Sequence, residues 1–172
     1  GAILLPGCMA CGLLLVSDVS KPTHLAPLDS SAQPLIARPT LEDAYAAAQQ
    51  RVHQLQHHPQ AWGYAGCTVE CIETHISWLL LVGEHVYKFK KPLALDFLDF
   101  STPALRLAAC QEELRINRRT APHMYLDVVG VEGDGSDSRP WRVKPWAAGD
   151  AAVVEPAVLM RRFDQQALLS RR

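Results

Sequence analysis

The apolar residues recur at helical spacing between residues 40 and 60 and form short strand-like runs from Thr68 onward. Thr40 is a suitable N-cap, and acidic residues follow it in the position that favours a helix N-terminus. Four apolar residues then recur at helical spacing: Tyr45, Ala48, Val52 and Leu55. Because Pro59 ends this pattern, the sequence predicts a helix over about 40–60.

Short apolar runs with turn residues between them begin at Thr68 and predict strands. The expected strands cover 68–72, 78–82, 85–90 and 125–131, with one or two more within 141–144 and 153–163. The pair Gly83–Glu84 predicts a tight hairpin between the second and third strands. The glycine-rich segment 133–137 predicts another turn.

A second helix is predicted between the third and fourth strands. Thr102 and Pro103 form a helix start, and Pro122 ends a helix that reaches about Arg119. Its expected inward positions are Leu105, Ala109, Leu114 and Ile116. The preceding segment, 92–100, is expected to be a loop with apolar anchors, and a further helix is expected to begin at Asp164.

This order of elements predicts an α+β fold. Hairpins dominate, so we expect an antiparallel sheet of about five strands with one packed helix, within residues 68–172. An irregular extension rich in proline is expected over 1–39, and the helix at 40–60 follows it.

Composition narrows the class of protein. The chain has 172 residues, is 48% hydrophobic and carries a net charge of -1, so no general electrostatic attraction to nucleic acid or membranes is expected. Five scattered cysteines argue against a disulfide framework and favour the cytoplasm. The apolar segment 2–16 lacks the basic flank of a signal peptide, and a start at Met9 is an alternative explanation for it.

Lys88 and Lys90 are the most unusual residues of the strand pattern. They share one face of a predicted strand that is otherwise apolar, and Lys91 takes the other face. A half-buried lysine requires an anionic partner, and Glu113 or Glu112 of the following helix can supply one. The pattern indicates either a phosphate-binding lysine or a basic edge that discourages aggregation.

The loop before the second strand offers further polar groups. Backbone amides and the hydroxyls of Thr74 and Ser77 can donate to phosphate oxygens, although the spacing alone favours a hairpin capped by these residues. Zinc ligands can also be sought in the set Cys67, Cys71, His75 and Cys110, but a strand and its loop give poor chelate geometry.

Five motifs occur in a fixed order along the second part of the chain. They are Glu73–Trp78, Tyr87–Pro92, Phe97–Thr102, Glu112–Pro122 and Met160–Phe163. Together they resemble the bacterial aminoglycoside phosphotransferase-like proteins, and the match covers about residues 68–172. In that family this module is often fused to a C-terminal P-loop ATP-binding domain, and the resemblance implies the N-terminal lobe of a protein-kinase-like fold.

The resemblance also implies roles for individual residues. Lys88 is then the lysine that contacts the α- and β-phosphates of ATP, with Lys90 as the alternative. Glu113 is the glutamate paired to it, with Glu112 as the alternative. The phosphate-covering loop comprises Thr74, His75 and Ser77, and the backbone of Met160 and Arg161 is expected beside the adenine.

The same resemblance predicts what lies outside this chain. Transfer of the ATP γ-phosphoryl group needs a catalytic carboxylate and Mg²⁺ ligands, and we expect both from a C-terminal lobe. No His-x-Asp segment and no G-x-x-x-x-G-K-[ST] motif occurs in the sequence. We therefore expect the nucleotide-binding lobe of a kinase that phosphorylates a hydroxyl of a small molecule, inactive by itself and with no catalytic or metal-binding residue of its own. The alternative is a non-catalytic module for nucleotide sensing or protein interaction.

Overall fold

The computed structural model describes most of the chain after residue 38. The described residues are 39–63, 66–147 and 152–162. They all belong to one compact unit, Arg38–Arg172. The predicted extension up to residue 38 and the predicted helix beginning at Asp164 lie outside the described residues.

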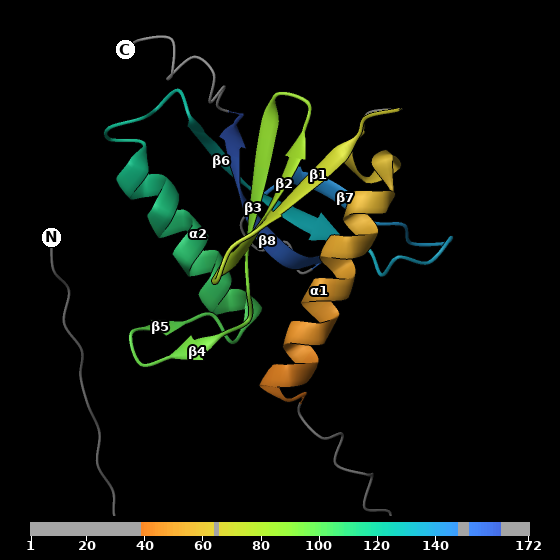
Figure 1. Ribbon diagram of the computed structural model, residues 1–172, viewed down its shortest axis with the longest axis horizontal. Coiled ribbons are helices and arrows are strands. Elements are labelled where there is room, and N and C mark those ends of the chain that lie inside the picture. Colours follow the sequence, from red (N-terminus) through yellow and green to blue (C-terminus); the bar gives the residue numbers. More distant parts are fainter. Residues whose placement is uncertain (1–38, 64–65, 148–151, 163–172) are drawn as a thin grey trace, which may run out of the picture. The chain divides into compact units, whose positions relative to one another are not determined.

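One six-stranded sheet lies between two helices (Figure 1). The elements in chain order are α1 (Leu41–His57), a 3-10 turn (Pro59–Trp62), β1 (Val69–Glu73), β2 (Ser77–Val82), β3 (His85–Lys90), β4 (Ala94–Leu95), β5 (Leu98–Asp99), α2 (Pro103–Asn117), β6 (Tyr125–Glu132), β7 (Arg142–Pro145) and β8 (Val153–Arg161). The spatial order is β1-β2-β3-β8-β6-β7, and neighbouring strands are antiparallel. β4 and β5 pair separately as a small hairpin.

The predicted α+β class with an antiparallel sheet is confirmed, but the number of packed helices was wrong. The sheet has six strands where about five were expected, because both of the segments that were given one or two strands form one, and β7 lies at the edge beside β6. Two helices pack on it rather than one, because α1 covers the face opposite to α2. Among the described residues, neither helix is long and apolar enough to cross a membrane.

Both helices begin where the sequence predicts. The Thr40 hydroxyl accepts the N–H of Asp43, and the Asp43 carboxylate accepts the N–H of Thr40, which forms a capping box. The Thr102 hydroxyl accepts the N–H of Leu105, and Pro103 occupies the first helical position. These caps satisfy backbone donors that have no partner within a helix.

The main core lies between α1 and the sheet. Ala48, Val52 and Leu55 of α1 are buried there, as the helical spacing predicts, and Tyr45 packs against them. The sheet contributes Trp78, Leu80, Val82, Tyr87, Phe89, Val129, Val131 and Ala157. Alternation along β3 therefore places Tyr87 and Phe89 toward α1 and leaves the other face of the strand for its lysines.

The inward face of α2 differs from the prediction. Leu105 and Ile116 were expected inside, but they are 40% and 48% exposed. The fully buried positions of this helix are Arg106 and Cys110. The prediction failed because it counted apolar residues only, whereas an arginine with a buried partner takes an inward position here.

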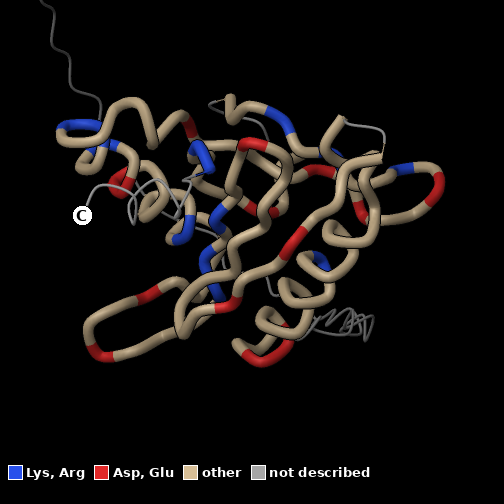
Figure 2. Tube along the Cα trace, turned by 45° about the horizontal axis from the view of Figure 1, so that its top comes forward, with Lys and Arg blue, Asp and Glu red and all other residues tan. Residues whose placement is uncertain are grey.

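The segment predicted as a loop at 92–100 contains the β4–β5 hairpin. Phe100 is buried and anchors the hairpin base, as expected, but Phe97 at the tip is 85% exposed. Figure 2 shows acidic positions on this hairpin, at the lower left, and basic positions along the central strands.

We predict that stability depends on the α1 face of the sheet more than on the open part of the other face. Leu80 is fully buried, so Leu80→Ala should lower the free energy of unfolding by about 2–5 kcal/mol. Ile72 on the neighbouring strand is 50% exposed, so Ile72→Ala should change it by about 0.5 kcal/mol or less. Urea denaturation of both variants measures this, and equal losses would contradict the assigned core.

Candidate functional site

The structure brings the two strand lysines to one carboxylate of α2. Lys88 Nζ lies 2.8 Å from Glu113 Oε1, and Lys90 Nζ lies 2.7 Å from Glu113 Oε2. The lysines share a face of β3 because they are two residues apart, and Glu113 comes from the helix that covers this face. The cluster of Lys88, Lys90 and Glu113 is called the lysine clamp below.

Electrostatics keep Glu113 ionised in this half-buried position. Burial raises the pKa of Glu113 and is the largest single influence on it. Hydrogen bonds and charges from Lys88 and Lys90 together outweigh burial and hold the pKa below its ordinary value of 4.5. Two cations share one anion, so the clamp carries a net positive charge at neutral pH.

The two lysines have different surroundings. The Lys90 side chain is 6% exposed, and its ammonium lies 5.0 Å from the centre of the Phe100 ring. The Lys88 side chain is 25% exposed, so its remaining N–H donors can reach a ligand from solvent. Lys90 is therefore placed to hold Glu113, and Lys88 is placed to contact an anion.

Neighbouring charged residues do not compete for the clamp. Glu112, the alternative partner in the sequence prediction, is exposed and pairs with Arg115 instead. Lys91 points to the opposite side, where it binds Glu73 at 2.6 Å and lies over the Trp78 ring. The pairing thus involves Glu113 and not Glu112.

The two hydroxyl side chains of the loop between β1 and β2 are used or buried within the protein. Thr74 Oγ1 accepts the N–H of Ser77 and donates to the Ser77 carbonyl, so this hydroxyl closes the turn. Ser77 begins β2 opposite Lys90 and is 1% exposed; its Oγ has no hydrogen-bond partner among the described residues. His75 is exposed at the loop. Of the three side chains predicted to cover phosphates, only that of His75 is therefore both exposed and free of the turn's own hydrogen bonds.

Met160 and Arg161 form the end of β8. Met160 lies opposite Val86 on β3 and packs on the α2 side of the sheet. The N–H of Arg161 donates to the Met124 carbonyl at 2.8 Å, so this donor is already used within the protein. Arg161 also lies opposite His85 in the pairing of β3 with β8.

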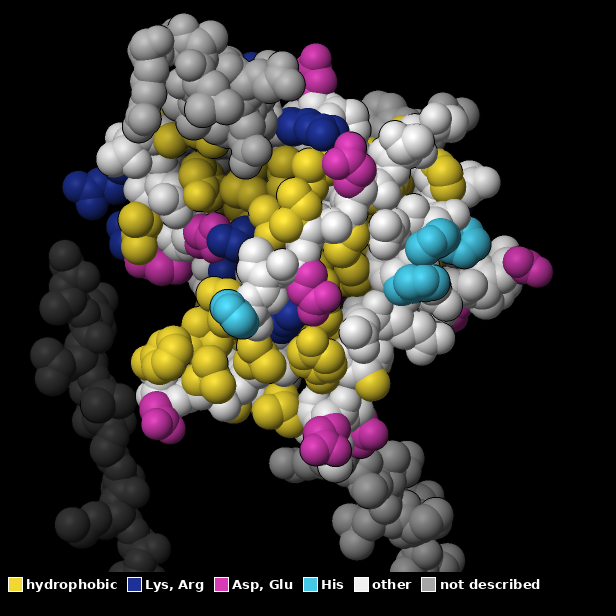
Figure 3. Space-filling model, viewed as in Figure 1, with side chains coloured by type: hydrophobic (Ala, Val, Ile, Leu, Met, Phe, Trp, Pro, Cys, Tyr) yellow, Lys and Arg dark blue, Asp and Glu magenta, His cyan; other side chains and the backbone are white. Residues whose placement is uncertain are grey.

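An apolar surface continues from the clamp across the strands that α2 leaves open. Ile72 and Leu79 lie opposite each other on β1 and β2, and Leu79 lies opposite Lys88 on β3. Ile72 is half exposed and Leu79 is partly exposed. Figure 3 shows apolar side chains gathered over these strands beside a small group of basic and acidic side chains.

A second buried charge cluster was missed by the sequence reasoning. Glu155 of β8 is 2% exposed and accepts two hydrogen bonds from Arg106 of α2, at 2.5 and 3.0 Å. Arg51 of α1 reaches the same carboxylate at 2.8 Å. The signal was present, because a glutamate inside the apolar run 153–158 needs a cationic partner for the same reason as the strand lysines.

Other candidate sites lack the required geometry. Cys71 packs with the α1 side of the sheet and Cys110 with the α2 side, so they cannot share a metal. In the described part of the chain, no group of three or more His, Cys, Asp and Glu side chains is arranged to hold an ion. Burial raises the pKa of the Cys110 thiol to about 12, which suits a core residue rather than a nucleophile.

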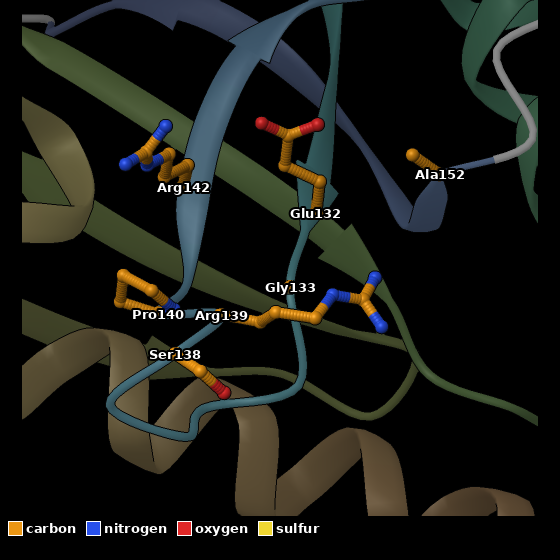
Figure 4. Close-up of a pocket in the computed structure, with 7 residues that line it drawn as sticks. All are labelled: Glu132, Gly133, Ser138, Arg139, Pro140, Arg142 and Ala152. Atoms are coloured by element: carbon orange, nitrogen blue, oxygen red, sulfur yellow. The ribbon is translucent and has the colours of Figure 1, made fainter.

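One shallow pocket of about 230 Å³ lies at the far edge of the sheet (Figure 4). It is formed by the ends of β6 and β7, the turn between them and Ala152. Its Glu132 pairs with Lys144 at 2.6 Å, and Arg139 lies 3.5 Å from Asp134 in an exposed pair. None of the clamp residues lines this pocket.

Comparisons with known proteins give relatives without a named activity. The chain is 36% identical over 103 residues to uncharacterized proteins of Mycobacterium bovis and of two strains of Mycobacterium tuberculosis. The match covers 59% of this chain and 18% of each relative, so the chain spans less than a fifth of their length. No protein-family model and no solved structure matches the chain.

The clamp predicts a pH dependence of stability. Since the folded pKa of Glu113 is depressed, its pairs stabilise the fold fully above the ordinary value of 4.5 and lose this contribution as the pH falls through the folded pKa. Glu113→Gln should lower the free energy of unfolding by about 3 kcal/mol at pH 7 and should remove part of its fall below pH 5.

Urea denaturation between pH 3 and pH 7 measures both effects. Glu112→Gln is the matched control, because it removes the same charge one residue earlier from an exposed pair and should have little effect. If both variants kept the wild-type pH profile, the assigned role of Glu113 in stability would be wrong.

Proposed function

We propose that this chain is the nucleotide-binding lobe of a kinase-like phosphotransferase that acts on a hydroxyl group of a small molecule. The observation that carries the proposal is the lysine clamp, in which a partly exposed Lys88 and a buried Lys90 share Glu113. A lysine on the third strand paired with a glutamate on the following helix is the arrangement that positions ATP phosphates in protein kinases.

The fold supports the same proposal. Three antiparallel strands of the six-stranded sheet precede α2, and β8 returns to lie between β3 and β6. The site therefore has a cation at its centre, a helix carboxylate to fix that cation and an apolar surface beside it. A nucleotide needs these properties, because its phosphates are anionic and its base is flat and largely apolar.

On this proposal Lys88 contacts the phosphates and Lys90 keeps Glu113 in place. The base lies over the apolar surface near Ile72 and Leu79, toward Met160. The Mg²⁺ ligands, the catalytic carboxylate and the contacts to the acceptor hydroxyl would come from the C-terminal lobe that completes the kinase-like fold. ATP with Mg²⁺ and a small-molecule acceptor are thus the proposed ligands, with neither nucleic acid nor a membrane as partner.

Calorimetric titration with ATP and Mg²⁺ tests the proposal. Weak but measurable binding is expected for the wild type, and Lys88→Met should abolish it while keeping the apolar stem of the side chain. Lys91→Met is the matched control, since it removes the same charge from the opposite side of the strand. Circular dichroism checks that both variants fold, and equal binding by the two would remove Lys88 from the site.

A turnover assay tests the expectation that this chain binds the nucleotide but lacks the catalytic carboxylate. The 172-residue chain should transfer no phosphoryl group to hydroxyl acceptors above background, because the catalytic carboxylate is expected elsewhere. Release of ADP is followed with a panel of small hydroxyl compounds. Robust turnover that Lys88→Ala abolishes would place the catalytic group within this chain and would overturn this part of the proposal.

A further inference from the structure

A buried ion cluster ties both helices to the same strand. Glu155 accepts from Arg106 on α2 and from Arg51 on α1, although these helices lie on opposite faces of the sheet. This is possible because β3 pairs with β8 only as far as Phe89 and Ala157, so Glu155 lies beyond the end of that pairing. The cluster of Arg51, Arg106 and Glu155 is called the Glu155 cluster below.

The Arg106 guanidinium makes several hydrogen bonds, and together they fix its orientation. Its guanidinium binds both oxygens of Glu155, and Nη1 donates to the Phe100 carbonyl at 2.8 Å and to the Ser101 carbonyl at 3.3 Å. A planar guanidinium held at two carboxylate oxygens cannot turn without breaking a hydrogen bond. Because Arg106 is 3% exposed, water cannot easily replace these partners.

The same helix face carries Glu113. Arg106, Cys110 and Glu113 follow one another at spacings of four and three residues, so they lie in one row along α2. The ends of this row are about 10 Å apart. A rotation of the helix that broke the Arg106 contacts would therefore also move the Glu113 carboxylate away from Lys88 and Lys90.

Apolar packing alone provides little orientation for α2. Its only fully buried residues are Arg106 and Cys110, whereas Leu107 and Leu114 are partly buried. We infer that Arg106 and Glu155 are positioning residues of the lysine clamp: their two-point contact sets the rotation of α2 that places Glu113 between the two lysines. The consequence for nucleotide binding rests on the proposed function above.

Arg51 supplies an internal comparison. It donates one hydrogen bond to Glu155 from α1, and its Nε has no hydrogen-bond partner among the described residues. It also lies over the Trp141 ring, at 5.5 Å. Since α1 does not carry Glu113, loosening Arg51 should affect stability without changing the clamp.

The test measures the pKa of Glu113 in the full 172-residue chain by NMR titration of ¹³C-labelled glutamate. Arg106→Lys keeps the charge but loses the two-point contact, so the pKa should rise above its ordinary value of 4.5, because burial then acts without the two lysines. Arg51→Lys, which alters the same carboxylate from the other helix, should leave the Glu113 pKa depressed as in the wild type.

A second variant keeps the test decisive if Arg106→Lys does not fold. The triple replacement Arg51→Met, Arg106→Met and Glu155→Leu removes all three charges together, and such apolar replacements of buried ion clusters often preserve the fold. Loss of the depressed Glu113 pKa in this folded variant supports the inference. A Glu113 pKa that stays depressed in Arg106→Lys or in the triple variant overturns it.

The affinity for ATP with Mg²⁺ is measured on the same proteins as a separate readout. If the wild type binds no ATP while Arg106→Lys still raises the Glu113 pKa, the positioning role stands and the proposed function fails. If the wild type binds ATP and Arg106→Lys changes neither the affinity nor the Glu113 pKa, the positioning role fails and the proposed function stands.

Discussion

One buried carboxylate binds both helices that cover the sheet. Glu155 has lost almost all contact with water, and an unpaired charge in that environment would be strongly destabilising. Arg106 and Arg51 provide its partners from opposite sides of the sheet, so the packing of α1 and of α2 has to bring both guanidinium groups to this point. Apolar contacts make the packing favourable, but they tolerate small rotations that the ion cluster does not.

The lysine clamp combines a structural cation with an accessible one. Lys90 is buried against Phe100 and Glu113, so most of its charge serves the fold. Lys88 shares the same carboxylate at a more exposed position and has donors left for a ligand. Sharing one anion between two cations leaves a positive site whose geometry is fixed by the protein itself, which on the proposed function would lower the entropic cost of binding the phosphates.

The sequence predicted those features that depend on residues close together in the chain. The bounds of β3, both helix starts and the approach of Lys88 to Glu113 follow from alternation, capping and the need of a strand lysine for an anion. The inward face of α2 was not predictable in this way, because the carboxylate that pairs with the buried Arg106 belongs to Glu155, 49 residues later. Ser77 was assigned to a loop because nothing local shows that β2 already begins there, opposite Lys90.

The alternation of side chains along β3 also bears on how the chain avoids misfolding. Aromatic residues at 87 and 89 face the core, and ammonium groups at 88 and 90 face the other side. If β3 paired with its neighbours one residue out of register, every side chain would change face, and two charges would enter the apolar core. Lys88 and Lys90 thus also destabilise the nearest incorrect pairing of β3, because a shifted register would bury their charges without partners.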